Sequence, residues 1–457
     1  MSTFSGLNTA LSALKSQRRG LDLTGQNIAN ANTVGYSRQR VELTAIGGAT
    51  PAMYAKPAVD DGGVKVAATT RIRDQYLEAR GYTEHARQNL LSGRAEILSD
   101  VEMAFNEPSD TGIAARLNEL SAGFADVADN PEDSGSRNQL LVRAQIVATS
   151  LNSMATGFAN RFESRHAELG NTITDVNTVA NRLADLNDKV VRAVNGGIEA
   201  NELMDQRDLL VAQLVDLTGA TVTRDPSGAS NLELGGVALV TGATARALAV
   251  TGSSTLAGQG ASPVVLRFAD DGTAVAGLNG RTGALVEALN VTLPSYASAM
   301  DGVAANLIST VNAVHQSGFT SAGAPGAAMF TGTTAGTIAM AITDPNDIAA
   351  SSDPTLSLDG SNADKLANLG SIPGSAALKY AQVVSRIGVE VSTSIQVATT
   401  QDTITEQVDL ARTSVSGVNT DEELTAMLTY QRSYQAASKV MTTIDEMLDT
   451  LINRMGH

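Results

Sequence analysis

A heptad repeat of apolar residues runs through thirty-seven residues near the end of the chain, from Thr420 to Gly456. Thr420 and Glu423 have the S/T-x-x-E spacing of a capping box, which predicts a helix start, and Gly456 is the expected helix end. The apolar residues recur in alternating steps of three and four, and this period of 3.5 is typical of a coiled-coil contact. They are Met427, Tyr430, Tyr434, Ala437, Met441, Ile444, Leu448, Leu451 and Met455.

The beginning of the chain repeats this pattern. The same steps of three and four connect Phe4, Leu7, Leu11, Leu14, Arg18, Leu21, Gly25 and Ile28, and only Arg18 and Gly25 depart from apolar character. Two heptad helices at opposite ends of one chain predict a paired coiled-coil stalk. A two-helix stalk buries too little apolar surface to offset the ordering of its backbone securely, so we expect its outer faces to meet other copies.

Composition limits the classes of partner. The net charge of −16 at pH 7 disfavours nucleic acid and anionic membranes. The chain has no cysteine, which excludes disulfides and thiol chemistry. Residues 1–25 lack the pattern of a cleaved signal peptide, and no apolar run approaches the length of a membrane span.

The chain predicts a mainly helical fold with an inserted β domain. We expect residues 1–60 and 417–457 to form the terminal coiled-coil domain, and residues 61–218 and 291–416 to form a bundle of long helices. From Gly219 the composition shifts to Gly, Thr, Val and Ala in short alternating runs. These runs predict a β domain over residues 219–290, with strands at 221–223, 232–234, 237–241, 264–268 and 273–276. We expect helix again from 283 to 316, interrupted at Pro294.

No catalytic or cofactor motif occurs in the sequence, so we expect a non-enzymatic protein without cofactor or metal. Glu163 and His166 have a di-iron spacing, but they stand alone and are better interpreted as surface residues of a helix. The acidic residues Asp344, Asp347 and Asp353 fit helix caps and turns better than a calcium site. Paired arginines, such as Arg71 with Arg73, are best explained by salt bridges.

One segment carries a family resemblance. Asn27-Ile-Ala-Asn-Ala-Asn-Thr-Val-Gly-Tyr36 resembles the signature of the bacterial flagellar rod, hook and hook-associated proteins, and Ser37-Arg-Gln-Arg-Val41 resembles the hook-associated junction family in particular. Further matches follow in order at 63–77, 203–210, 293–296, 312–319, 330–333, 344–350 and 418–440, and the resemblance is weakest from about 219 to 278.

The resemblance implies a structural subunit that is exported unfolded by the flagellar type III apparatus and forms the junction between hook and filament. It implies terminal helices in an inner tube and middle domains facing outward. The implied partners are further copies of the chain, the hook protein, the second junction protein (hook-associated protein 3) and an export chaperone.

We therefore expect the assembly interface to comprise the two seams and the corner that follows the first helix. Its residues are Leu7, Leu11, Leu14, Leu21, Ile28, Asn30, Asn32, Gly35, Tyr36, Arg38, Met427, Tyr430, Tyr434, Met441, Ile444, Leu448 and Leu451. The alternatives are another axial subunit, such as a hook protein or flagellin, an extracellular binding module that uses its β domain, or an enzyme.

Overall fold

A computed structural model describes residues 3–46 and 62–454, and helices dominate it. The α-helices of the described residues are α1 (Thr3–Ala29), α2 (Gln75–Phe105), α3 (Ile113–Asp129), α4 (Ser134–Asn195), α5 (Asn201–Thr218), α6 (Leu256–Gln259), α7 (Gly280–Glu287), α8 (Leu293–Gln316), α9 (Ser361–Ala367), α10 (Ala376–Ser416) and α11 (Thr420–Arg454).

The strands form small antiparallel sheets. In the described part of the chain they are β1 (Gln39–Ile46), β2 (Gly63–Arg71), β3 (Thr221–Arg224), β4 (Ser230–Leu234), β5 (Val237–Thr241), β6 (Thr244–Ala245), β7 (Leu248–Thr251), β8 (Val265–Phe268), β9 (Phe330–Thr331) and β10 (Ala339–Met340). β1 pairs with β2 next to the first helix, and β3 to β6 form a meander in the order β3-β4-β5-β6. The mainly helical fold with an inserted β domain is confirmed.

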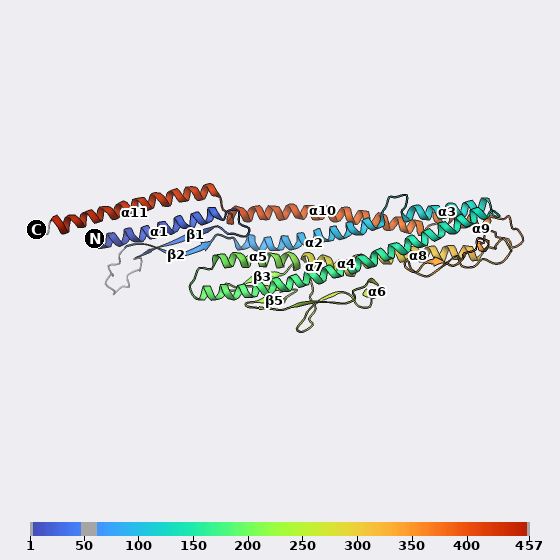
Figure 1. Cartoon of the computed structure of the whole chain (residues 1–457), viewed down its shortest axis with the longest axis horizontal. Helices are drawn as coiled ribbons and strands as arrows, with labels where there is room; N and C mark the ends of the chain where they lie inside the picture. The colour runs from blue at the N-terminus through green and yellow to red at the C-terminus, as the bar shows by residue number, and fades with distance from the viewer. Residues whose placement is uncertain (1–2, 47–61, 455–457) are drawn as a thin grey trace.

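The chain is a nested hairpin. α1 and α11 lie side by side at one end of the elongated molecule, and α2 and α10 continue from them toward the other end (Figure 1). α2 and α10 are antiparallel, because His85 near the start of α2 contacts Asp409 near the end of α10, whereas Phe105 at the end of α2 lies against Tyr380. The predicted pairing of the terminal helices is therefore confirmed, and a second helix pair extends it.

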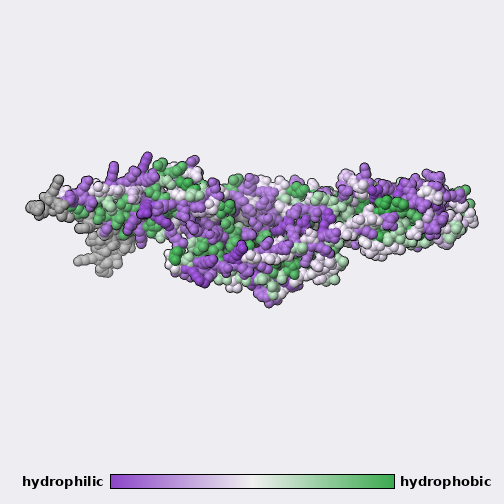
Figure 2. Space-filling model, viewed as in Figure 1, coloured by the Kyte–Doolittle hydropathy of each residue, from purple (hydrophilic) through white to green (hydrophobic). Residues whose placement is uncertain are grey.

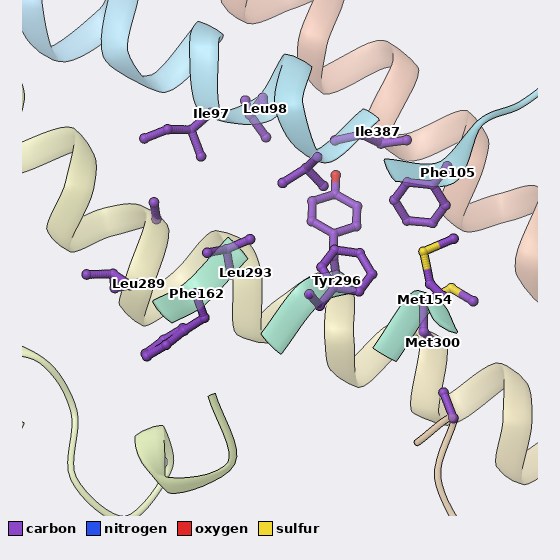
Figure 3. Close-up of a cluster of buried hydrophobic side chains, with 14 of the residues drawn as sticks. Ile97, Leu98, Phe105, Met154, Phe162, Leu289, Leu293, Tyr296, Met300 and Ile387 are labelled. Atoms are coloured by element: carbon purple, nitrogen blue, oxygen red, sulfur yellow. The ribbon is translucent and has the colours of Figure 1, made fainter. Parts of the chain in front are cut away.

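α4 is the longest helix, with 62 residues, which corresponds to about 93 Å at 1.5 Å per residue. Asp133 caps its first turn by accepting hydrogen bonds from the backbone amides of Gly135 and Ser136. The apolar face of α4 supplies buried residues to the core over most of its length. Figure 3 shows one part of this core, where Met154 lies near Tyr296 and Met300 of α8 and Phe105 of α2, and Phe162 lies near Leu289 and Leu293.

Asparagine side chains fasten the β domain to the helices. Asn177 and Asn187 of α4 each bond both the backbone amide and the backbone carbonyl of one β-domain residue, namely Leu248 and Ser230. Asn290 does the same with Val264, at 2.9 and 2.7 Å. Since each carboxamide replaces one residue of a neighbouring strand, the β domain is fixed against the helices at three separate points.

Two local predictions were wrong. Pro294 does not interrupt the helix, because it lies in the first turn of α8, where a missing amide hydrogen costs little. The helix is irregular just before Pro294, where Ala288–Thr292 form a π-helical turn. This turn contains Asn290 and presents its side chain to the β domain. The strand predicted at 273–276 is reduced to one isolated bridge between Arg267 and Ala274, whereas β6 and β7 were not predicted.

His315 holds the segment after α8 in place. Its Nδ1 donates to the carbonyl of Ala327 at 2.6 Å, and its Nε2 accepts from the amide of Ala349 at 3.0 Å. This arrangement needs the neutral ring, because a protonated Nε2 would point a hydrogen at the Ala349 amide. Burial lowers the pKa of His315 below its ordinary value of 6.5, which keeps the ring neutral.

We expect acid to destabilise this region through His315. The unfolded chain takes up the proton at its ordinary pKa and the folded chain only at lower pH, so the stabilisation is complete above 6.5 and is lost as pH falls below it. Between about pH 7.5 and pH 5.5 the free energy of unfolding should fall by roughly 1 kcal/mol more than in the His315→Asn variant. Urea unfolding of both proteins at the two pH values measures the difference, and equal losses would contradict the assignment.

Candidate assembly surface

α1 and α11 are antiparallel and in a fixed register. A Cβ placed on Gly6 would lie 3.2 Å from Ile444, and one placed on Gly20 would lie 2.6 Å from the Tyr430 ring. Asn27 donates to the Glu423 carboxylate at 3.0 Å. In each of these three pairs the residue numbers add to 450, and successive pairs are 14 and 7 residues apart on both helices. The contact therefore follows whole heptads without a slip.

The line of α1 that faces α11 is made of small residues. Gly6 and Gly20 lie on it, and the predicted leucines of α1 lie one residue further along, about 100° around the helix. Because glycine lets the two backbones approach closely, the large side chains of α11 pack onto α1 itself. The leucines are thus left on the flank of the contact.

The leucine side of α1 and the part of the predicted α11 seam that does not face α1 form one continuous face. At 100° per residue, the α1 flank and the matching flank of α11 point to the same side of an antiparallel pair. The opposite side of α1 is covered by β2, where Ser16 donates to the carbonyl of Val64. The half-buried members of this face are Leu7, Leu14, Leu21, Ile28, Met427, Met441 and Leu448.

The remaining seam residues differ in exposure. Ile444 is buried and Tyr430 is half-buried against α1, whereas Leu11 and Tyr434 are 41% and 38% exposed. Leu451 belongs to α11, but its side chain lies outside the described residues. Leu424, on the same flank, is 50% exposed. Figure 2 shows apolar residues interspersed with polar ones over this end of the molecule. We use the name apolar face for Leu424, Tyr434 and the seven half-buried residues given in the preceding paragraph.

Asn27 joins the terminal helices at the corner. Its Nδ2 donates to the carbonyl of Gln39 and to Glu423, at 2.9 and 3.0 Å. Its Oδ1 accepts from the amide of Gln39 and from the Tyr36 hydroxyl, at 3.1 and 2.8 Å. All four bonding positions of one buried amide are therefore used to connect α1, the corner, β1 and α11.

The corner residues named from the sequence differ in the contacts that they make. Gly35 has a φ of 80°, and a Cβ there would meet Leu209 of α5 at 2.6 Å, so glycine is required. Asn30 bonds only within the turn, and Asn32 is exposed. Burial, followed by the nearby Asp205, Glu423 and Glu202 carboxylates, raises the pKa of the Tyr36 phenol to about 12, so the phenol stays a donor.

Arg38 explains why the predicted capping box was wrong. Its Nε donates to Glu423 at 2.7 Å and its Nη1 to Glu422 at 2.8 Å. Glu423 therefore does not bond back to the helix start, and the Asn419 side chain accepts from the amides of Asp421 and Glu422 instead.

A buried ion-pair network connects the end of β2 and the segment after it to α5. Asp205 and Asp208 of α5 accept from Arg71 at 2.8 and 2.9 Å, and Arg73 donates to Asp208 at 2.6 Å. Burial alone would raise the pKa of the Asp208 carboxyl, but the Arg207, Arg73 and Arg71 guanidinium groups outweigh it and hold the pKa below its usual range. The salt-bridge interpretation of the Arg71 and Arg73 pair is confirmed.

These features define a class of protein before any comparison is made. Both chain ends build one helix pair, one side of which is covered by a hairpin and the other left as an apolar face, as in a subunit that completes its packing by assembly. Within residues 3–46 and 62–454 no three acidic, histidine or cysteine side chains gather as a metal site, and no helix has the length and apolar character of a membrane span.

Comparison with known proteins identifies the family. The model of the flagellar hook-associated protein FlgK helical domain matches residues 98–330, just over half of the chain. The flagellar basal body rod FlgEFG C-terminal model matches 412–455, and the flagella basal body rod protein model matches 7–36. The chain belongs to the FlgK family of flagellar hook-associated proteins, which is structural and not enzymatic.

Full-length relatives agree with this assignment. Flagellar hook-associated protein 1 of Bacillus subtilis (strain 168) is 28% identical over 507 aligned positions, covering 100% of this chain and 99% of the relative. The protein of the same name from Salmonella typhimurium is 24% identical over 558 positions, covering 98% and 99%. The flagellar hook junction protein FlgK from Burkholderia pseudomallei has the same fold, with a TM-score of 0.63 at 16% identity over 75% of this chain and 100% of that one. The chain is a structural component of the extracellular flagellum, of the hook–filament junction type.

We expect Asn27→Asp to loosen the terminal pair. The change removes both donors and sets a carboxylate against Glu423 and the carbonyl of Gln39, which should cost the corner roughly 2–4 kcal/mol. Proteolysis within α1 and α11 should become several-fold faster. Asn181→Asp, at an exposed position of α4, is the control with the same charge change. Equal cleavage rates for the two variants would contradict the role assigned to Asn27.

Proposed function

We propose that copies of this chain assemble through the apolar face into a ring or short helical tube, with the terminal helices on the inside. The observation that supports this is the incomplete packing of the two-helix layer. One side of it is closed by the β1–β2 hairpin, while the other leaves leucines, methionines and a tyrosine half-buried or exposed. A surface of this kind is stabilised when a partner removes it from water.

The family suggests which neighbours meet this assembly. We propose that the hook protein contacts it on one side and the second junction protein, hook-associated protein 3, on the other. An export chaperone would cover the apolar face before assembly, because an uncovered face of this type favours aggregation. We propose export through the flagellar type III apparatus without a cleaved signal peptide.

We also propose that the chain works as three units. Residues 1–60 with 417–457 would supply the inner tube, residues 61–218 with 291–416 the helical body, and residues 219–290 the outer surface. The asparagine contacts of Asn177, Asn187 and Asn290 support a β domain that moves with the body and does not swing freely. Ser37, in the first unit, donates to Asp205 of the body through its amide and its hydroxyl, and these contacts support a fixed angle between tube and body.

Leu424→Asp combined with Tyr434→Asp tests the assembly. Both side chains are exposed in the single chain, so the variant should fold and melt like the parent protein. In an assembled wall both carboxylates would be buried without partners, at a cost of several kcal/mol each. We expect cells that make only this variant to shed full-length filaments into the medium, as seen by electron microscopy.

Leu356→Asp combined with Leu358→Asp is the matched control. These leucines are 55% and 69% exposed and lie between the last strand and α9, at the far end of the molecule from the apolar face. Cells that make the control should keep their filaments. Normal filaments with the Leu424 and Tyr434 variant would refute the proposal, and loss of the hook itself would favour an earlier position in the axis.

A further inference from the structure

The two outer edges of the terminal pair carry exposed charges of both signs. The edge of α1 that points away from α11 has Lys15, Arg18 and Asp22, all exposed. Arg18 is 77% exposed, and its only salt bridge among the described residues is with Asp22 at 4.0 Å. Such a solvated i,i+4 pair leaves the guanidinium available to another partner.

The exposed charges on the outer edge of α11 change sign twice along the helix. Asp421 comes first, Arg432 and Lys439 follow, and Glu446 and Asp449 come last. These residues lie about 160–200° around the helix from the line that faces α1. They are thus separate from the apolar face, and the two surfaces can be changed independently.

A neighbour at the same height would be repelled. In the register of the terminal pair, residues of α1 and α11 lie at the same height along the helix axis when their two residue numbers add to 450. If the α1 edge of one copy met the α11 edge of an unshifted neighbour, Arg18 would face Arg432. Lys15 would lie level with Gln435 and Asp22 with Leu428, so no opposite charge lies level with either of these side chains to offset the repulsion.

A shift of two heptads reverses the sign of the contact. Moving the neighbour by 14 residues, about 21 Å along the helix axis, brings Arg18 level with Glu446 and Lys15 level with Asp449. The same shift puts Asp22 within three residues of Lys439, a distance that a lysine side chain spans. A shift of 14 residues in the other direction pairs only Lys15, with Asp421, and leaves Arg18 beyond the start of α11.

We propose that neighbouring copies meet edge to edge, α1 against α11, with an axial offset of two heptads selected by these charges. This inference rests on the proposed self-assembly and adds its register. Each exposed ion pair contributes little affinity, but repeated around the assembly the charges exclude the unshifted arrangement, as e and g charges select partners in coiled coils. Each copy would then be displaced along the axis relative to its neighbour, which gives a helical arrangement and not a flat closed ring.

Engineered cysteines test the offset, because the native chain has none. Arg18→Cys with Glu446→Cys should give intermolecular disulfides when flagella isolated from cells making only this variant are oxidised. Within one copy these positions are separated by about 21 Å along the axis and point away from each other, so an internal disulfide is excluded. Arg18→Cys with Arg432→Cys reports the unshifted contact, and Lys15→Cys with Asp421→Cys reports the opposite shift.

Multimer ladders on a non-reducing gel are expected for the first pair alone. A ladder from either of the other pairs would overturn the offset, and no ladder from any variant that enters flagella would overturn the edge contact. Absence of every variant and of the parent chain from flagella would instead refute the proposed assembly.

Charge reversal gives a second test that needs no cross-link. Lys15→Glu with Arg18→Glu makes both sides of the proposed contact acidic, and Glu446→Lys with Asp449→Lys makes both sides basic. Each alone should lose several-fold of its incorporation into flagella, and producing both in one cell should restore it, because each edge then finds its opposite. Failure of the mixture to recover incorporation would overturn the proposal.

Discussion

The antiparallel contact between the first and last helices is the constraint on which the rest of the structure depends. It brings residues nearly 440 positions apart to within van der Waals distance, and everything between them becomes a nested hairpin. Glycines on α1 set how closely the two helices approach, and one asparagine fixes the corner where the chain turns back. Since the small residues occupy the contact line, the large apolar side chains remain beside it. The small residues that let the chain ends pair therefore also leave the apolar surface that is available to neighbours.

A second physical device recurs along the molecule. In several places one asparagine side chain bonds both the amide and the carbonyl of a residue in an extended segment. Asn27 does so with Gln39, Asn187 with Ser230, and Asn312 bonds the amide and carbonyl of Phe330. A carboxamide is the shortest side chain that can replace a strand neighbour in this way. Long helices thereby hold irregular and β segments in fixed positions.

The parts of the fold that were predictable from sequence are those with a local signal. The heptads of α1 and α11 predicted a pairing of the chain ends, and the change in composition at Gly219 predicted the inserted β domain. The actual line of contact was not predictable, because Gly6 and Gly20 carry no hydrophobic signal. Arg71 forms ion pairs with Asp205 and Asp208, which lie more than 130 positions away in the sequence. These pairs can therefore be identified only from the folded structure. Asn27 lay within the recognised motif, but its role depends on four hydrogen bonds to three residues, which lie in three other segments.

The central claim is that the terminal helix pair is incomplete in a single chain and is completed by its neighbours. Hydrogen–deuterium exchange measured on dilute purified protein and on isolated flagella tests it most directly. The account predicts rapid exchange in α1 and α11 of the single chain, slow exchange in α4 and α8 of the same sample, and strong protection of all four helices in flagella. Equal protection of α1 and α11 in both samples would mean that the helix pair is stable by itself, and would contradict the account.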